Sequence, residues 1–170
     1  MLTAASFSGL EPWALTPNGL AVVAEDDRYC EFTPDGVAGK DDSHEVLVAW
    51  SDVLDIELSI PTHPLWLWWV LAPVFLLIPS ALLRESEIYV KVSAKQGTYH
   101  LHLGRPSSAP YPVANAAVTD ALFEVLSERQ ELSHLGDPHQ GQRLLTVARQ
   151  CASWSISRSH SRLVAALDRE

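Results

Sequence analysis

The sequence predicts an α+β fold, mainly β, in which a small antiparallel β-barrel or β-sandwich is followed by helices. Two patterns support this prediction. Short segments of alternating apolar and polar residues recur between Trp13 and Leu103, separated by turn residues. From Val113 onward, apolar residues instead recur at intervals of three and four, as in an amphipathic helix. An uncharged, apolar run, Pro64–Leu83, interrupts the β part and predicts an apolar helical insertion.

The first strands are predicted to form an antiparallel meander. Leu15–Ala21 and Phe32–Ala38 share the pattern of an apolar residue, Thr-Pro, Asn or Asp, and then Gly. Proline fixes φ at the first central position of a turn, and glycine supplies the positive φ that follows. Each segment therefore predicts a hairpin. Asp26-Asp27 lies between them and predicts a third reversal.

Four further strands are expected, at His44–Trp50, Val53–Ile60, Glu87–Ala94 and Thr98–Leu103. The second and third alternate apolar and polar residues, which indicates one face on a core and one face in water. We expect these two strands to belong to one sheet despite the run between them, because neither side of the run has enough strands for a domain of its own.

The remaining segments are predicted to be an arm and helices. Residues 1–12 are expected to be a loosely held arm, and residues 13–138 one β domain with the insertion 64–83. A capping helix is expected over 113–134, with Gly136 and Pro138 as its stop signals. The tail, residues 139–170, predicts a helix with a break near Ser155–Ser161.

The apolar run has the strongest signal for a contact surface. As a helix, its twenty residues would extend about 30 Å, which matches the hydrocarbon core of a bilayer. The sequence leaves three interpretations open: a bent segment that dips into one leaflet, a single transmembrane helix, and a surface buried against protein. The residues expected to contact membrane or a partner are Leu65, Trp66, Leu67, Trp68, Trp69, Leu71, Phe75, Leu76, Leu77 and Leu82.

Several features of the sequence argue against particular functions or locations. The formal net charge of −9 disfavours binding to nucleic acid, because the phosphate backbone attracts clustered Lys and Arg. Cys30 and Cys151 are far apart in sequence and have no metal or redox spacing, so two reduced thiols are expected. The N-terminal segment lacks the features of a secretory signal, which favours the cytoplasmic side.

No catalytic, cofactor or metal site is predicted. His100 and His102 lie on one face of a strand, but a metal would need a third ligand such as His44 or His63. Asp52, Asp55 and Glu57 could suggest paired carboxylates, yet such a pattern more often marks a solvated strand face. The Ser and His residues near the C-terminus lack a nucleophile-elbow context, and no glycine-rich phosphate loop occurs.

Three segments resemble the bacterial pleckstrin-homology-like domains. They are Phe32–Gly39 (FTPDGVAG), Val46–Leu58 (VLVAWSDVLDIEL) and Ile88–Pro106 (IYVKVSAKQGTYHLHLGRP), the last leading into a helix. The resemblance implies a β-barrel or sandwich capped by a helix, and a binding or membrane-associated module without shared catalytic residues. It offers no role for the apolar run or for the helical tail.

The sequence therefore predicts a non-enzymatic, membrane-associated interaction module that Pro64–Leu83 holds at the inner membrane face, with membrane lipid or a protein as partner. The alternative is a soluble assembly or regulatory protein that uses the run as a homo-oligomer or partner interface.

Overall fold

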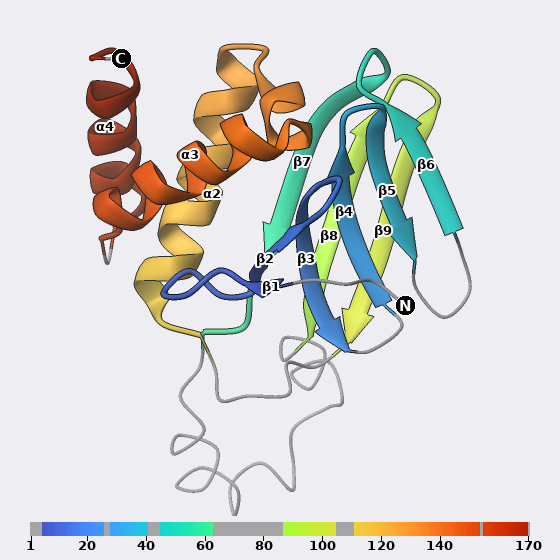
Figure 1. Cartoon of the computed structure of the whole chain (residues 1–170), viewed down its shortest axis with the longest axis horizontal. Helices are drawn as coiled ribbons and strands as arrows, with labels where there is room; N and C mark the ends of the chain where they lie inside the picture. The colour runs from blue at the N-terminus through green and yellow to red at the C-terminus, as the bar shows by residue number, and fades with distance from the viewer. Residues whose placement is uncertain are drawn as a thin grey trace, which may run out of the picture.

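The computed structural model describes residues 5–25, 28–40, 45–62, 87–104, 111–153 and 155–169. These residues form an α+β fold with two antiparallel sheets and three α-helices (Figure 1). The helices lie together on one side of the sheets. The α+β class expected from the two sequence patterns is confirmed.

The first sheet is the predicted meander. Its strand order is β1–β2–β3–β4–β5–β6, so each strand pairs with its neighbour in sequence. Both proline–glycine hairpins are confirmed: Thr16 pairs with Gly19, and Thr33 pairs with Gly36. The bounds are β1 Ala5–Ser6, β2 Trp13–Thr16, β3 Gly19–Glu25, β4 Arg28–Thr33, β5 Gly36–Lys40 and β6 Glu45–Ala49.

The second sheet contains the strands on either side of the apolar run. Its order is β7 (Val53–Ser59), β8 (Ile88–Ala94) and β9 (Gly97–Gly104). Ser59 pairs with Tyr89, and Leu58 pairs with Val90. The prediction that the strands flanking the run belong to one sheet is therefore confirmed.

The two sheets pack face to face rather than closing into a barrel. No strand of one sheet pairs with a strand of the other among the described residues. The core lies between the sheets, where Val90 and Leu101 of the second sheet and Phe32 of the first are almost fully buried. The sequence left a barrel and a sandwich open. The described strands form two sheets and no closed barrel.

A β-bulge changes one expectation for β7. Strict alternation would place Leu54 on the buried face with Ile56 and Leu58. The register shifts between Val53 and Asp55, and Leu54 is 57% exposed. The extra residue of the bulge turns this side chain away from the core.

The capping helix α2 (Val113–Glu128) is shorter than the predicted 113–134. Gln130 adopts a left-handed backbone with φ of 58°, and the Glu131 N–H donates to the Leu126 carbonyl at 2.8 Å. With the Gln130 N–H donating to the Ser127 carbonyl, this is a Schellman motif, which ends a helix. Glycine usually occupies the left-handed position, so a glutamine there gives no stop signal in the sequence.

Two helices follow a short 3₁₀ segment, η2 (Leu132–Gly136). They are α3 (Pro138–Cys151) and α4 (Ile156–Leu167). Asp137 caps α3, accepting hydrogen bonds at 2.9 Å from the backbone N–H groups of His139 and Gln140. The predicted break near 155–161 is wrong in position, because the chain leaves α3 at Ala152 and is helical again from Ile156.

The described part of the N-terminal arm is not loosely held. Phe7 is buried, Leu10 is fully buried, and Ala5–Ser6 pairs with β2. The apolar side chains of this segment belong to the core, which explains why it lies against the domain. Both cysteines are buried and unbonded.

Candidate functional site

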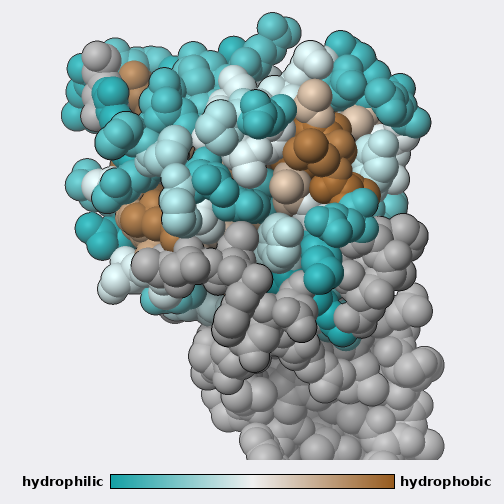
Figure 2. All heavy atoms as spheres, turned by 45° about the vertical axis from the view of Figure 1, so that its right-hand side comes forward, coloured by the Kyte–Doolittle hydropathy of each residue, from teal (hydrophilic) through white to brown (hydrophobic). Residues whose placement is uncertain are grey.

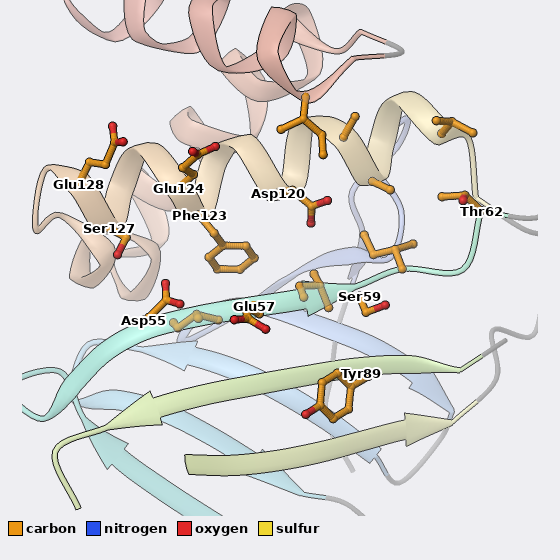
Figure 3. A pocket seen from close by; sticks show the side chains of 17 residues that line it. Asp55, Glu57, Ser59, Thr62, Tyr89, Asp120, Phe123, Glu124, Ser127 and Glu128 are labelled. Atoms are coloured by element: carbon orange, nitrogen blue, oxygen red, sulfur yellow. The ribbon is translucent and has the colours of Figure 1, made fainter. Parts of the chain in front are cut away.

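A groove of about 890 Å³ lies between strand β7 and helix α2. Figure 3 shows the helix above the strand, with side chains from both elements directed into the space between them. The groove is a candidate binding site because it combines apolar surface with several carboxylates. Its lining residues are Asp55, Ile56, Glu57, Leu58, Ser59, Ile60, Thr62, Tyr89, Val113, Ala116, Ala117, Asp120, Phe123, Glu124, Ser127, Glu128 and Ile156.

The strand side of the groove carries two acidic residues. Asp55 and Glu57 alternate with the buried Ile56 and Leu58, so the burial of the apolar pair directs the acids away from the core. This placement on one strand face agrees with the sequence analysis. The Lys91 ammonium on β8 lies 2.8 Å from a Glu57 carboxylate oxygen, in an exposed ion pair.

The helix side of the groove is anchored by Phe123. Its ring points toward β7 (Figure 3) and lies 5.7 Å from the Trp13 ring and 6.1 Å from the Phe32 ring, centroid to centroid. The Trp13 indole N–H also donates to the Thr119 hydroxyl of α2 at 3.2 Å. The aromatic cluster therefore fixes α2 on the sheets and sets the position of the groove.

Asp120 is the most perturbed acid of the groove. Its side chain points from α2 toward β7 (Figure 3). Burial, with a smaller contribution from the nearby Glu124 carboxylate, raises the pKa of Asp120 to about 6. Among the described residues that line the groove there is no lysine or arginine, so none of them compensates the Asp120 charge.

Two further acids form the rim of the groove on the side of α4. Glu124 and Glu128 lie one turn apart on α2 and point away from β7 (Figure 3). The His160 Nε2 atom lies 3.6 Å from a Glu128 carboxylate oxygen. One ligand atom from each of these three residues lies within 4.8 Å of the others, a spacing that could admit a metal ion. Exposed acidic side chains commonly cluster without a metal, so this spacing alone does not indicate a metal site.

Exposed apolar side chains are few elsewhere on the described surface. Most of the described part of the face in Figure 2 is hydrophilic, with separate hydrophobic areas. The large hydrophobic residues that are exposed are Leu47, Leu54, Val113 and Ile156. Val113 and Ile156 line the groove, so it collects apolar surface as well as charge.

The predicted contact residues of the apolar run, from Leu65 to Leu82, lie outside the described residues. The structure does place the residues on either side of the run. Thr62 follows β7 and Glu87 precedes β8, and the two strands pair with each other. In the described part of the chain, no helix is both long enough and apolar enough to cross a membrane.

The described residues among the others weighed from the sequence lie at separate places in the fold. His100 and His102 lie on one face of β9, where both rings contact the Tyr89 ring. His102 Nδ1 lies 4.0 Å from a Glu87 carboxylate oxygen. Their suggested partners, His44 and His63, lie outside the described residues. Asp52 lies 4.0 Å from the Lys95 ammonium at the β8–β9 turn.

Sequence reasoning missed the groove itself. The sequence suggests Asp55 and Glu57 as paired carboxylates or, more often, as a solvated strand face, and neither interpretation includes a groove shared with α2. Asp120 was not singled out, because an acid in an amphipathic helix is ordinarily solvent-exposed. The sequence does place Asp120 beside the apolar stripe of α2. That position indicates a groove residue only when β7 is known to lie opposite.

Comparison of this chain with protein-family models, with curated proteins and with solved structures found no match.

Proposed function

We propose that this chain is a non-enzymatic interaction module of pleckstrin-homology-like type, held at the cytoplasmic face of a membrane by Pro64–Leu83. The pairing of β7 with β8 carries this proposal. Because Ser59 lies opposite Tyr89, the run leaves the sheet and returns to it at the same end.

This pairing argues against one of the three interpretations of the run, the single transmembrane helix. A segment with both ends on one side of a bilayer crosses it an even number of times. Two helical crossings need roughly 17–25 residues each, and the run has enough for only one. A dip into one leaflet therefore agrees with both the pairing and the length, whereas a single crossing would separate paired strands.

The composition of the run explains why it would bind a membrane. It is uncharged, and Trp66, Trp68 and Trp69 cluster near its start. Tryptophan favours the interface between headgroups and acyl chains. The protein is acidic, with a net charge of −9, so attraction to anionic lipids would add little to binding.

The domain type is supported by the arrangement of its elements. Two antiparallel sheets pack on each other, and α2 packs Val118, Leu122 and Val125 into the core beside them. The candidate groove is then a surface on which the domain can bind a partner, as befits an interaction module.

Vesicle flotation tests the membrane part of the proposal. The full chain is expected to float with neutral phosphatidylcholine vesicles. A variant in which 64–83 is replaced by a short Gly/Ser turn is expected to stay in the soluble fraction. Since that replacement alters much of the chain, the triple variant Trp66→Ser, Trp68→Ser, Trp69→Ser serves as a milder test and should float less.

The control is Trp50→Phe, which removes a tryptophan that stacks on Phe32, outside the run. It should float like the unmodified chain. Flotation of the Gly/Ser variant would contradict the proposal. If the full chain remains soluble as a dimer and the Gly/Ser variant is a monomer, the run is a self-association surface instead.

A further inference from the structure

A buried ring nitrogen of His160 has no hydrogen-bond partner in the described part of the chain. His160 lies on α4, and its Nε2 atom is buried although the side chain as a whole is partly exposed. A Glu128 carboxylate oxygen lies 3.6 Å from this nitrogen, which is too far for a hydrogen bond. Buried polar atoms in folded proteins are nearly always paired, so an unpaired one indicates an ion or another ligand at that position.

Two carboxylates lie beside this nitrogen. Glu124 and Glu128 are one turn apart on α2 and point away from β7 (Figure 3). Like charges at this spacing on a helix repel each other. One oxygen from each carboxylate and the His160 Nε2 atom lie within 4.8 Å of one another. A divalent cation among these three atoms would pair the buried nitrogen and remove the repulsion between the acids.

The distances agree with a tetrahedral metal site. Zinc binds nitrogen and oxygen ligands at about 2.0–2.2 Å, so two ligand atoms of one tetrahedral ion lie about 3.4 Å apart. The separation of 3.6 Å between His160 Nε2 and the Glu128 oxygen is close to this value. Glu124 is exposed, so its side chain can rotate to bring the third ligand atom to the same distance.

The packing of α4 on α2 holds the three residues together. Ser159 and Leu163, which lie on either side of His160 along α4, are both fully buried. Near the ends of the two helices, an Arg129 guanidinium nitrogen of the α2 C-cap lies 2.6 Å from an Asp168 carboxylate oxygen of the α4 C-cap. His160 is therefore fixed beside α2 by contacts that do not involve the acids themselves.

We propose that Glu124, Glu128 and His160 bind one Zn²⁺ ion, with water in the fourth position. Zinc accepts imidazole and carboxylate ligands together, whereas Mg²⁺ and Ca²⁺ prefer oxygen ligands alone. The ion would join α4 to α2 at the rim of the groove. This inference goes beyond the proposed function and does not depend on membrane association.

Competition with a chromogenic zinc chelator measures the binding. The full chain, without a histidine tag and in mild detergent, is titrated against the Zn²⁺-loaded chelator. We expect saturable binding of one Zn²⁺ per chain, and no displacement of this ion by a roughly tenfold excess of Mg²⁺ or Ca²⁺. Absence of saturable binding, or displacement by Mg²⁺ or Ca²⁺, would overturn the inference.

A pair of histidine variants locates the nitrogen ligand. His160→Gln removes the imidazole and should weaken Zn²⁺ binding at least about tenfold, since even groups behind the ligands contribute that much. The control is His102→Gln, which removes a histidine of β9 that contacts the Tyr89 ring. It should bind Zn²⁺ like the unmodified chain. Equal effects of the two substitutions would contradict the assignment of His160.

Two pairs of acid variants separate coordination from general attraction. Glu124→Gln with Glu128→Gln should also weaken binding at least about tenfold. Asp35→Asn with Glu45→Gln removes the same charge from exposed positions of the first sheet, and should leave the affinity nearly unchanged because salt screens distant charges. If both pairs weaken binding equally, the attraction is non-specific and the proposed site is wrong.

Thermal unfolding tests whether the folded chain holds the ion. A ligand of the folded state raises the unfolding midpoint as its concentration increases. Zn²⁺ should raise the midpoint of the unmodified chain but not that of His160→Gln. If His160→Gln already unfolds earlier in the presence of chelator, the Glu124→Gln with Glu128→Gln variant decides, because both glutamates are exposed. A rise with Zn²⁺ that persists in both variants would overturn the inference.

Discussion

At the scale of the residue, Asp120 is held where its charge is unfavourable. Its carboxylate lies in the groove, where burial raises the pKa to about 6 from 3.8. The folded chain therefore binds a proton more tightly than the unfolded chain does. The contribution of Asp120 to stability is full below about pH 4 and is lost as the pH rises through 6.

Replacement of this residue should stabilise the protein at neutral pH. Asp120→Asn removes the desolvation penalty of a partly buried charge. We expect an increase of about 1–2 kcal/mol in the free energy of unfolding at pH 7.5, after allowing for solvent screening of this partly exposed group. At pH 3 the two chains should differ little. Urea unfolding at both pH values measures this, and a destabilisation at pH 7.5 would contradict the assignment.

Leu122 tests the buried stripe of α2. The side chain is fully buried in the common core. Leu122→Ala should lower the free energy of unfolding by about 2–5 kcal/mol, because it leaves a cavity between the helix and the sheets. Glu124→Ala, on the opposite side of the same helix, is the control and should change it by less than about 0.5 kcal/mol. Equal effects of the two would mean that the stripe does not face the core.

At the scale of the element, short turn motifs predicted most of the β structure. The Thr-Pro-Asn-Gly and Thr-Pro-Asp-Gly turns, and the alternation in β7 and β8, depend on backbone chemistry that a few adjacent residues determine. The end of α2 at Gln130 and the exposure of Leu54 depend on a Schellman motif and a β-bulge. Neither has a distinctive residue at the position that matters, so the sequence could not predict them.

The 3₁₀ segment η2 depends on a close approach that the sequence does not reveal. A Cβ atom added to Gly136 would clash with the Thr33 carbonyl of β4 and crowd the Trp50 indole nitrogen, which donates to that same carbonyl at 2.8 Å. Gly136→Ala should therefore lower the free energy of unfolding by about 1–3 kcal/mol. Thermal unfolding measures the effect, and an unchanged midpoint would show that η2 can move away from β4 at little cost.

The groove belongs to neither β7 nor α2 alone. Its acids come from segments about sixty residues apart, and periodicity describes only one element at a time. The sequence placed Asp55 and Glu57 on one face of β7 correctly. What it could not give was the position of α2 opposite that face, which depends on the packing of Phe123 against Trp13 and Phe32.

At the scale of the whole molecule, the apolar run is an excursion between two paired strands. Replacing 64–83 with a Gly/Ser turn should leave the sheets and the packing of α2 intact, because loop length contributes little to the free energy of closing a hairpin. Near-ultraviolet circular dichroism, which reports the environment of Trp13 and Trp50, should remain native-like. A molten spectrum would mean that the run contributes to the core.

The most direct test of the proposed membrane association determines on which side of the membrane the two ends of the run lie. Single cysteines at Thr62→Cys and Glu87→Cys can be labelled with a membrane-impermeant maleimide, in a background where the buried Cys30 and Cys151 are replaced by Ala. In sealed bacterial membrane vesicles of known orientation, we predict that both positions label only when the cytoplasmic face is outside. Labelling of Thr62→Cys and Glu87→Cys from opposite faces would contradict the account.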